Sequence, residues 1–425
     1  MPSETSLAPA AELAEDAAER FLRYVRIDTQ SDEDSPTYPS TAKQLDLLRL
    51  LRDELEALGL EDAAIDEHGY VTATIEGTVA GDVPTIAFFA HADTARDVSG
   101  AGVEPRRFRY EGGTITLGDS GQRIRPEESP ELPKHVGHDL ITTDGTTLLG
   151  ADDKAGIAEI MAAAAYLVAH PEVPHGPVKV VFNPDEEVGR GVLHLAVESL
   201  GAVAAYTLDG STAGELQSET FSGAHVRMRI RGRSIHPGWA KGELVNAIKL
   251  AAEIVARLPK DSLSPETTDR RDGFVHPTLV SGDAAEVELR FIARDFEDDL
   301  LDRHVELLRG IAAEVAAAEP RCSIDVDSSV QYRNMRDSLH AHPEVVDNLE
   351  EAIRRVGLEP SRTAIRGGTD GSMLTQMGLP TPNVFTGGHD AHSEREWICV
   401  EDMGLAAATV VELAKVWAEQ HGGSA

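Results

Sequence analysis

The sequence predicts an α/β protein with a largely parallel, mixed β-sheet flanked by helices, into which a smaller α+β domain is inserted. Short apolar segments alternate with helical stretches over most of the chain, which is typical of a layered domain with a largely parallel sheet. One central region instead alternates apolar and charged residues. The length of 425 residues exceeds what one hydrophobic core usually organises, so we expect two domains.

The main domain is expected to contain five buried strands and at least three helices. The strands are the apolar segments 71–75, 85–90, 178–183, 204–208 and 382–386. Helical periodicity reaches residue 25, returns over residues 40–58 and predicts a further helix over 155–169. Strands and helices that alternate in this way favour parallel strand pairs joined by helices.

The inserted domain begins after Gly210. Between residues 226 and 231, apolar side chains alternate with arginines, which is the period of a half-exposed strand in an antiparallel sheet. A helix over 245–258, strands over 276–281 and 286–293, a helix over 297–318 and a strand over 323–330 follow. The order β-α-β-β-α-β predicts one sheet with both helices on one face. We therefore expect residues 1–212 and 332–425 in the main domain, and residues 213–331 in the insert.

The composition excludes several classes of partner. Asp and Glu number 73 against 39 Lys and Arg, and the formal charge of -34 repels phosphate backbones and anionic lipids. Neither nucleic acid nor a membrane is an expected partner. The two cysteines lie far apart, and the N-terminus lacks the charge and apolar pattern of a signal peptide. We therefore expect a cytoplasmic protein.

Acidic and imidazole side chains follow the expected strands at the point where each strand ends. They are His91 and Asp93 after the second strand, Glu186 and Glu187 after the third, Asp209 after the fourth, and His389 and His392 after the fifth. Asp152 lies in a further such segment, just before the expected helix at 155. Because ligands of open α/β sheets bind beyond the carboxyl ends of the strands, we expect these side chains to meet.

Each of these residues has an ordinary explanation when taken alone. His91 could be a satisfied polar residue, Asp152 a helix N-cap, Glu186 and Glu187 a solvated turn, and Asp209 a turn residue at a strand end. Together, however, their carboxylates would repel one another unless cations lay between them. Imidazole and carboxylate ligands without thiolate favour a catalytic zinc site, for which manganese or cobalt can substitute, and we expect two ions.

Several longer segments resemble the peptidase T family, within the clan of co-catalytic zinc peptidases and acylases. The matching segments are DTQS at 28–31, AHADTA at 90–95, ITTDG at 141–145, LLGADDKAG at 148–156, HPG at 236–238, RGGTDG at 366–371 and GG at 387–388. This resemblance covers nearly the whole chain. It implies a metallo-aminopeptidase that hydrolyses the N-terminal peptide bond of short peptides, chiefly tripeptides.

The resemblance also implies a role for each site residue. His91 and Asp209 would hold one zinc ion, Glu187 and His392 the other, and Asp152 would bridge the two. Glu186 would be the general base, and Asp93 would orient the His91 ring. His236, from its own or a neighbouring subunit, and Arg366 would bind the substrate. The inserted domain would close over the site as a lid.

Three questions stay open at this point. The family pattern before the last ligand is Gly-Gly-Tyr-Asn-Tyr-His, whereas this chain has Gly-Gly-His-Asp-Ala-His at 387–392, so His389 competes with His392. Motif position favours His392. A related N-acyl-amino-acid hydrolase, a carboxypeptidase or an inactive binding protein is the alternative function, although the intact Glu186 disfavours the last. Edge strands can pair between subunits, so both a monomer and a homodimer remain open.

Overall fold

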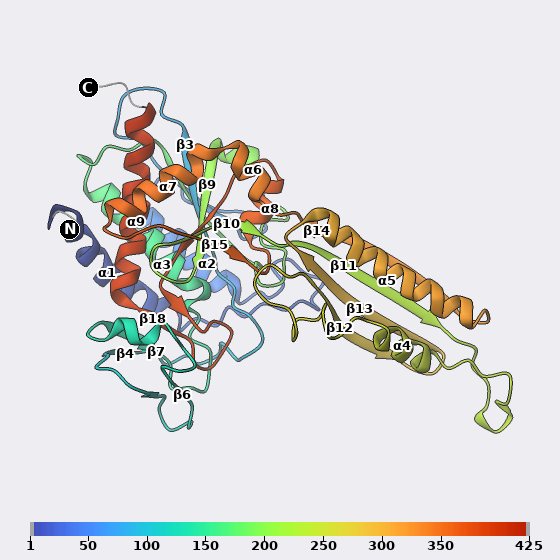
Figure 1. Cartoon of the computed structure of the whole chain (residues 1–425). Helices are drawn as coiled ribbons and strands as arrows, with labels where there is room; N and C mark the ends of the chain where they lie inside the picture. The colour runs from blue at the N-terminus through green and yellow to red at the C-terminus, as the bar shows by residue number, and fades with distance from the viewer. Residues whose placement is uncertain (1–3, 422–425) are drawn as a thin grey trace. The chain divides into compact units, whose positions relative to one another are not determined.

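The computed structural model describes residues 4–421 (Figure 1). The chain divides into two compact units. The first takes the chain up to Ser218, then Asp337–Thr363 and the chain from Thr369 onward, and the second takes Glu219–Arg336 and Ala364–Gly368. The expected boundaries were 212 and 331. The chain stays with the first unit as far as Ser218 because strand β10 (Glu215–Thr220) still pairs with the large sheet.

The first unit is built on an eight-stranded mixed sheet, so the predicted α/β fold class is confirmed. In spatial order its strands are β1 (Ala64–Ile65), β2 (Val71–Ile75), β8 (Val178–Asn183), β3 (Thr85–His91), β9 (Ala202–Gly210), β16 (Asn383–Phe385), β10 and β15 (Ser361–Ile365). The central strands β8, β3, β9 and β16 are parallel. Antiparallel pairs β1–β2, β2–β8 and β10–β16 lie toward the two edges.

Helices cover this sheet, and the long ones pack on one another. Helix α3 (Ala151–Ala169) contacts β3 and β9, and it also packs against α1 (Glu4–Tyr24) and α9 (Val400–His421). The remaining helices of this unit are α2 (Gln44–Ala57), α7 (Pro343–Arg355), α8 (Asp370–Gln376) and part of α6 (Arg336–Ala341). Phe88 and Phe89 point to opposite faces of β3 and are both buried, which explains why the strand has no polar alternation.

A smaller sheet in the same unit was not expected from the sequence. Its antiparallel strands are β17 (Gly388–His389), β18 (Trp397–Cys399), β7 (Asp139–Thr142) and β4 (Arg106–Arg109). A hairpin of β5 (Ile115–Thr116) and β6 (Arg123–Ile124) and the 3-10 turn η1 (Leu132–His135) accompany it around a core that contains Leu140 and Trp397. Strands of two to four residues are too short to show a period of alternation.

The second unit has the predicted element order β-α-β-β-α-β. Its elements are β11 (Ser222–Arg231), α4 (Ala247–Ala256), β12 (Phe274–Gly282), β13 (Glu286–Asp295), α5 (Asp298–Ala318) and β14 (Ser323–Tyr332). The strands form an antiparallel sheet in the order β12-β13-β11-β14. Met228 and Phe291 on the sheet share one buried core with Leu308 of α5, and α4 and α5 also touch each other. Both helices therefore lie on one face.

None of the helices in the described part of the chain is both long enough and apolar enough to cross a membrane.

Candidate metal centre

Parallel pairing brings the polar strand ends to one edge of the large sheet. His91 is the last residue of β3 and lies opposite Asn183, the last residue of β8. Glu186 and Glu187 follow β8, and Asp209 lies near the end of β9 on the other side of β3. All of these strands point the same way, so their carboxyl ends meet at one edge.

The carboxylate of Asp152 lies between two imidazoles. Its Oδ1 is 3.0 Å from His91 Nε2, and its Oδ2 is 3.2 Å from His392 Nε2. Asp209 Oδ1 lies 3.8 Å from His91 Nε2, and Glu187 Oε1 lies 2.9 Å from His392 Nε2. The structure thus brings all five expected ligands together within the first unit.

His389 lines a cavity next to Asp152 and Asp209, but its contacts are with other side chains. Its ring stacks on Trp397 with centroids 4.2 Å apart, and its Nδ1 lies 3.3 Å from Ser211 Oγ. His392 has φ 59°, in the left-handed region, and it is the imidazole that contacts Asp152. Of the two histidines that the sequence left in competition, only His392 lies at the cluster.

Asp93 contacts the His91 ring and also the backbone of Glu186 and Glu187. The Nδ1 atom of His91 lies 3.1 Å from the Asp93 carbonyl oxygen and 3.4 Å from Asp93 Oδ1. The Asp93 carboxylate also accepts hydrogen bonds from the backbone N–H groups of Glu186 (2.9 Å) and Glu187 (3.2 Å). A proton on His91 Nδ1 leaves a lone pair on Nε2, which then faces Asp152. His91 Nε2 and the Asp152 carboxylate oxygen would then present lone pairs to each other. They repel unless a cation, either a proton or a metal ion, lies between them.

The buried charges show how strongly the cluster needs positive charge. Burial raises the pKa of Asp209 and Glu186 well above the usual carboxyl value and the pKa of Glu187 to about 7. Contacts with Asp152 and Glu187 raise the pKa of His392 to about 11. Burial opposes charge on His91, but its hydrogen bonds to Asp152 and Asp93 outweigh that effect and raise its pKa well above the ordinary value. A divalent cation would supply this charge without protons.

The available donor atoms fit divalent cations. His91, Asp152 and Glu187 offer ligand atoms within 4.8 Å of one another, and so do His91, Asp153 and Asp209. Glu187 Oε1 is buried and, within residues 4–421, has no donor in hydrogen-bond geometry, although His392 Nε2 is near. Imidazole and carboxylate ligands without sulfur suit zinc, manganese or cobalt. The residues present therefore fit a pair of such ions.

Glu186 lies beside the cluster. Its Oε2 atom is 4.0 Å from His91 Nε2, and its backbone N–H is held by Asp93. A cavity next to Asp152 and Asp209 is also lined by Ser211, Gln217 and other residues of the same unit. A small ligand in this cavity would contact the cluster directly.

Glu396 supports the cluster, and nothing in the sequence pattern marked it. Its Oε2 accepts hydrogen bonds from the backbone N–H groups of Leu149 and Gly150, both at 2.7 Å, and its Oε1 accepts one from Asp152 at 3.1 Å. Glu396 is only 1% exposed. Gly150 has φ 80°, which favours glycine, and Asp152 follows two residues later. Glu396 thus holds the turn that presents Asp152.

His236 and Arg366 belong to the second unit. His236 is exposed, accepts a hydrogen bond from the Gly238 N–H at 3.1 Å and lies against Trp239. Arg366 donates to the carbonyl oxygens of Arg270 (2.8 Å) and Asp272 (2.9 Å) and lies over the Phe221 ring. These contacts give Arg366 a structural role within its own unit. The substrate-binding roles of both residues stay predictions.

Comparison with known proteins finds relatives that match most of the chain. The model of peptidase family M20/M25/M40 matches residues 142–416. Peptidase T of Geobacillus thermodenitrificans is 46% identical over 410 residues, which cover 96% of this chain and 100% of that protein. Aminopeptidase PepT of Bacillus cereus, at 24% identity and TM-score 0.72, aligns over 95% of this chain and 99% of its own, so the two share a fold.

A second solved structure shares the fold at lower similarity. The YXEP protein of Bacillus subtilis, described as a dinuclear metal-binding peptidase of the M20 family, has a TM-score of 0.64 at 16% identity. The alignment covers 95% of this chain and 98% of that one. The resemblance to peptidase T read from the sequence motifs is confirmed. The chain belongs to peptidase family M20/M25/M40.

Proposed function

We propose that this protein is a tripeptide aminopeptidase that uses two zinc ions to hydrolyse the N-terminal peptide bond of short peptides. The observation that carries the proposal is the position of Asp152, whose two carboxylate oxygens face two different imidazoles. One carboxylate placed in this way can bridge two cations. The membership of family M20/M25/M40 and the sequence identity to Peptidase T support the proposal that the protein with this site is a peptidase.

The ligands divide between the two positions by proximity. His91 and Asp209 would hold one ion, and Glu187 and His392 would hold the other, with Asp152 between them. When bound there, the zinc ions supply a water of lowered pKa, about 7 in zinc enzymes, and polarise the peptide carbonyl. Manganese or cobalt could substitute because the ligand set contains no thiolate.

Glu186 is the proposed general base. It is close to the ligands without being one of them, and burial raises its pKa well above the ordinary value, which suits a group that must hold a proton during turnover. Glu186 would take a proton from the attacking water at Oε2 and deliver it to the leaving amine. Asp93 would hold both Glu186 and His91 in place through the hydrogen bonds described above.

The second unit is the proposed lid. Its loop at His236 would stabilise negative charge on the reacting carbonyl or hold the substrate, and Arg366 would pair with the substrate carboxylate. Closure would expel water from the site and gate turnover.

A metal count combined with a substrate panel tests this function. We expect about two catalytic zinc ions per chain and cleavage of tripeptides at the first bond. Chelation should abolish this cleavage, and added zinc should restore it. N-acetylated tripeptides should resist, because an aminopeptidase requires a free amine. A preference for acetylated substrates, or release of the C-terminal residue, would instead support an acyl-amino-acid hydrolase or a carboxypeptidase.

A further inference from the structure

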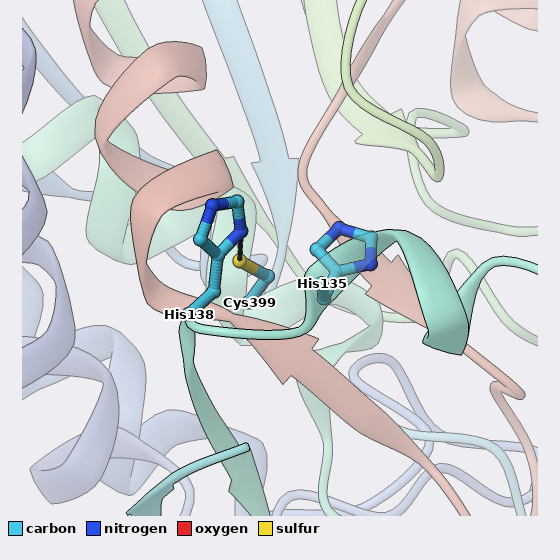
Figure 2. A group of neighbouring side chains, drawn as sticks. All are labelled: His135, His138 and Cys399. Carbon is cyan, nitrogen blue, oxygen red and sulfur yellow. Dashed lines mark hydrogen bonds between the residues drawn. The ribbon is translucent and has the colours of Figure 1, made fainter. Parts of the chain in front are cut away.

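A second cluster of buried imidazoles lies at the small sheet, outside the metal centre described above. His135 ends η1, His389 is in β17 and Asp402 is in the first turn of α9. Their exposed fractions are 6%, 7% and 5%. His138 and Cys399 are neighbours, and Figure 2 shows both of them beside His135. The proposed aminopeptidase reaction uses none of these residues.

The hydrogen bonds of His135 place its lone pair toward a carboxylate. Its Nδ1 lies 3.0 Å from the Glu131 carbonyl oxygen, which can only accept, so Nδ1 carries the proton. Its Nε2 lies 2.8 Å from Asp402 Oδ2. Unless His135 carries a second proton, two electron-rich atoms face each other in a buried site. A histidine that donates to a carbonyl with one nitrogen and faces a carboxylate with the other is arranged as metal-binding histidines are.

His389 supplies a second lone pair, on its Nε2 atom. Ser211 Oγ donates to the Gly388 carbonyl oxygen at 2.6 Å, so the same Oγ accepts from His389 Nδ1 at 3.3 Å. The proton on Nδ1 leaves Nε2 as an acceptor. This Nε2 atom is buried, and no hydrogen-bond partner for it exists among residues 4–421. A buried acceptor without a partner is costly unless a cation occupies the space in front of it.

We propose that His135, His389 and Asp402 bind a divalent transition-metal ion, separate from the catalytic pair. The three residues offer ligand atoms that all lie within 4.8 Å of one another. Two imidazoles and one carboxylate are a ligand set for zinc and similar ions, with the remaining positions left for water. Zinc is the ion with which the site is to be probed.

The overlapping group of His135, His138 and Cys399 is the weaker candidate. Burial raises the pKa of the Cys399 thiol far above the value of a free cysteine, so a metal ion bound here would first have to displace the thiol proton. Its Sγ lies 3.5 Å from Glu401 Oε2, which accepts the thiol proton, and 3.7 Å from His138 Nδ1. A neutral thiol is a poor zinc ligand. The carboxylate of Asp402 therefore makes the first group the better site.

An ion here would join three separate segments of the chain. It would tie η1 to β17 and to the start of α9, and β17 leads within three residues to His392. The loop that carries a catalytic ligand would thereby be fixed at its base. The proposed ion holds these segments together and positions the loop, and it takes no part in peptide cleavage.

The test counts zinc by mass spectrometry in protein equilibrated with zinc and then desalted. The double variant His91→Ala, His392→Ala removes one ligand of each catalytic ion, and we expect it to keep about one zinc per chain. Adding His389→Phe, which keeps a ring to stack on Trp397, should bring the count to about zero. The matched control His138→Gln in the same double variant should keep its ion. A double variant that holds no zinc, or an ion that survives His389→Phe, would overturn the proposal.

A second measurement uses no variant, so it does not depend on whether a variant folds. Cobalt(II) is titrated into the metal-free wild-type protein and followed by absorption. We expect a third equivalent to bind without a thiolate-to-cobalt charge-transfer band. Saturation at two equivalents, or a third equivalent that brings the thiolate band, would refute the His135, His389 and Asp402 site.

Discussion

Glu396 and Asp152 are 244 positions apart in the sequence, yet the Glu396 carboxylate accepts the Asp152 backbone N–H at 3.1 Å. The same carboxylate also accepts two further N–H groups from the turn before Asp152. The position of the proposed bridging ligand is therefore set by a carboxylate that is not among the proposed metal ligands.

Glu396→Gln should weaken both metal binding and activity. The amide N–H₂ of glutamine would face backbone N–H groups, so at least one of the three hydrogen bonds would be lost and Asp152 would shift. Changes to groups that orient metal ligands typically lower metal affinity or activity by about 10- to 100-fold. Zinc affinity and kcat/KM on a tripeptide are the measurements. Glu394→Gln, in the same loop but bonded to Gln122, is the control and should change either value less than about twofold.

Glu186→Gln should retain its metal ions and lose most of its activity. The amide cannot take a proton from water, whereas the proposed ligand atoms of His91, Glu187 and Asp209 are unchanged. Loss of a general base costs roughly 10²- to 10⁴-fold in rate. Metal content and kcat are measured on the same sample. Full activity with normal metal content would remove Glu186 from the mechanism.

Glu159→Gln should stabilise the protein, and more so as the pH rises. Glu159 on α3 is fully buried, and within residues 4–421 its carboxylate has no hydrogen-bond partner. Burial raises its pKa well above 4.5. Between the unfolded and folded pKa values the unfolded chain binds fewer protons, so this carboxyl lowers the free energy of unfolding progressively as pH increases.

The Glu159→Gln variant has no carboxyl group at this position, so its free energy of unfolding does not fall with pH in this way. At pH 8 its free energy of unfolding should exceed that of the wild type by about 1 kcal/mol or more, and the two should converge near pH 4 to 5. Urea unfolding of metal-free protein at several pH values measures the difference. The exposed Glu104→Gln is the control and should show no such trend. A gap that is constant across the pH range would contradict the raised pKa.

Phe291→Ala should destabilise the second unit strongly. Phe291 is 1% exposed and belongs to the core shared by the sheet and α5. Truncation of a buried phenylalanine costs about 3 to 5 kcal/mol. Leu279→Ala on β12, where Leu279 is 37% exposed, is the matched control and should cost less than about 1 kcal/mol. Urea unfolding followed by circular dichroism compares the two.

Much of the fold was predictable because it depends on local patterns. Strands β2 and β8 begin and end at the residues expected from their apolar segments. The alternation in β11 predicted a sheet with one exposed face, and its even-numbered residues from Val226 to Ile230 are indeed buried. The small sheet escaped prediction because its strands are short and pair across distant parts of the chain, as β18 does with β7.

The sequence by itself determined five buried strands of the large sheet, the element order of the inserted domain, the family resemblance and the set of acidic and imidazole residues at the strand ends. These follow from side-chain periodicity and from motifs read along the chain, which need no knowledge of distant contacts. Only the tertiary structure decided that His392 and not His389 meets Asp152, that Glu396 holds the Asp152 turn, and that His135 and His389 come together. Those relationships join residues far apart in sequence, and only the packed sheets bring such residues close together in space.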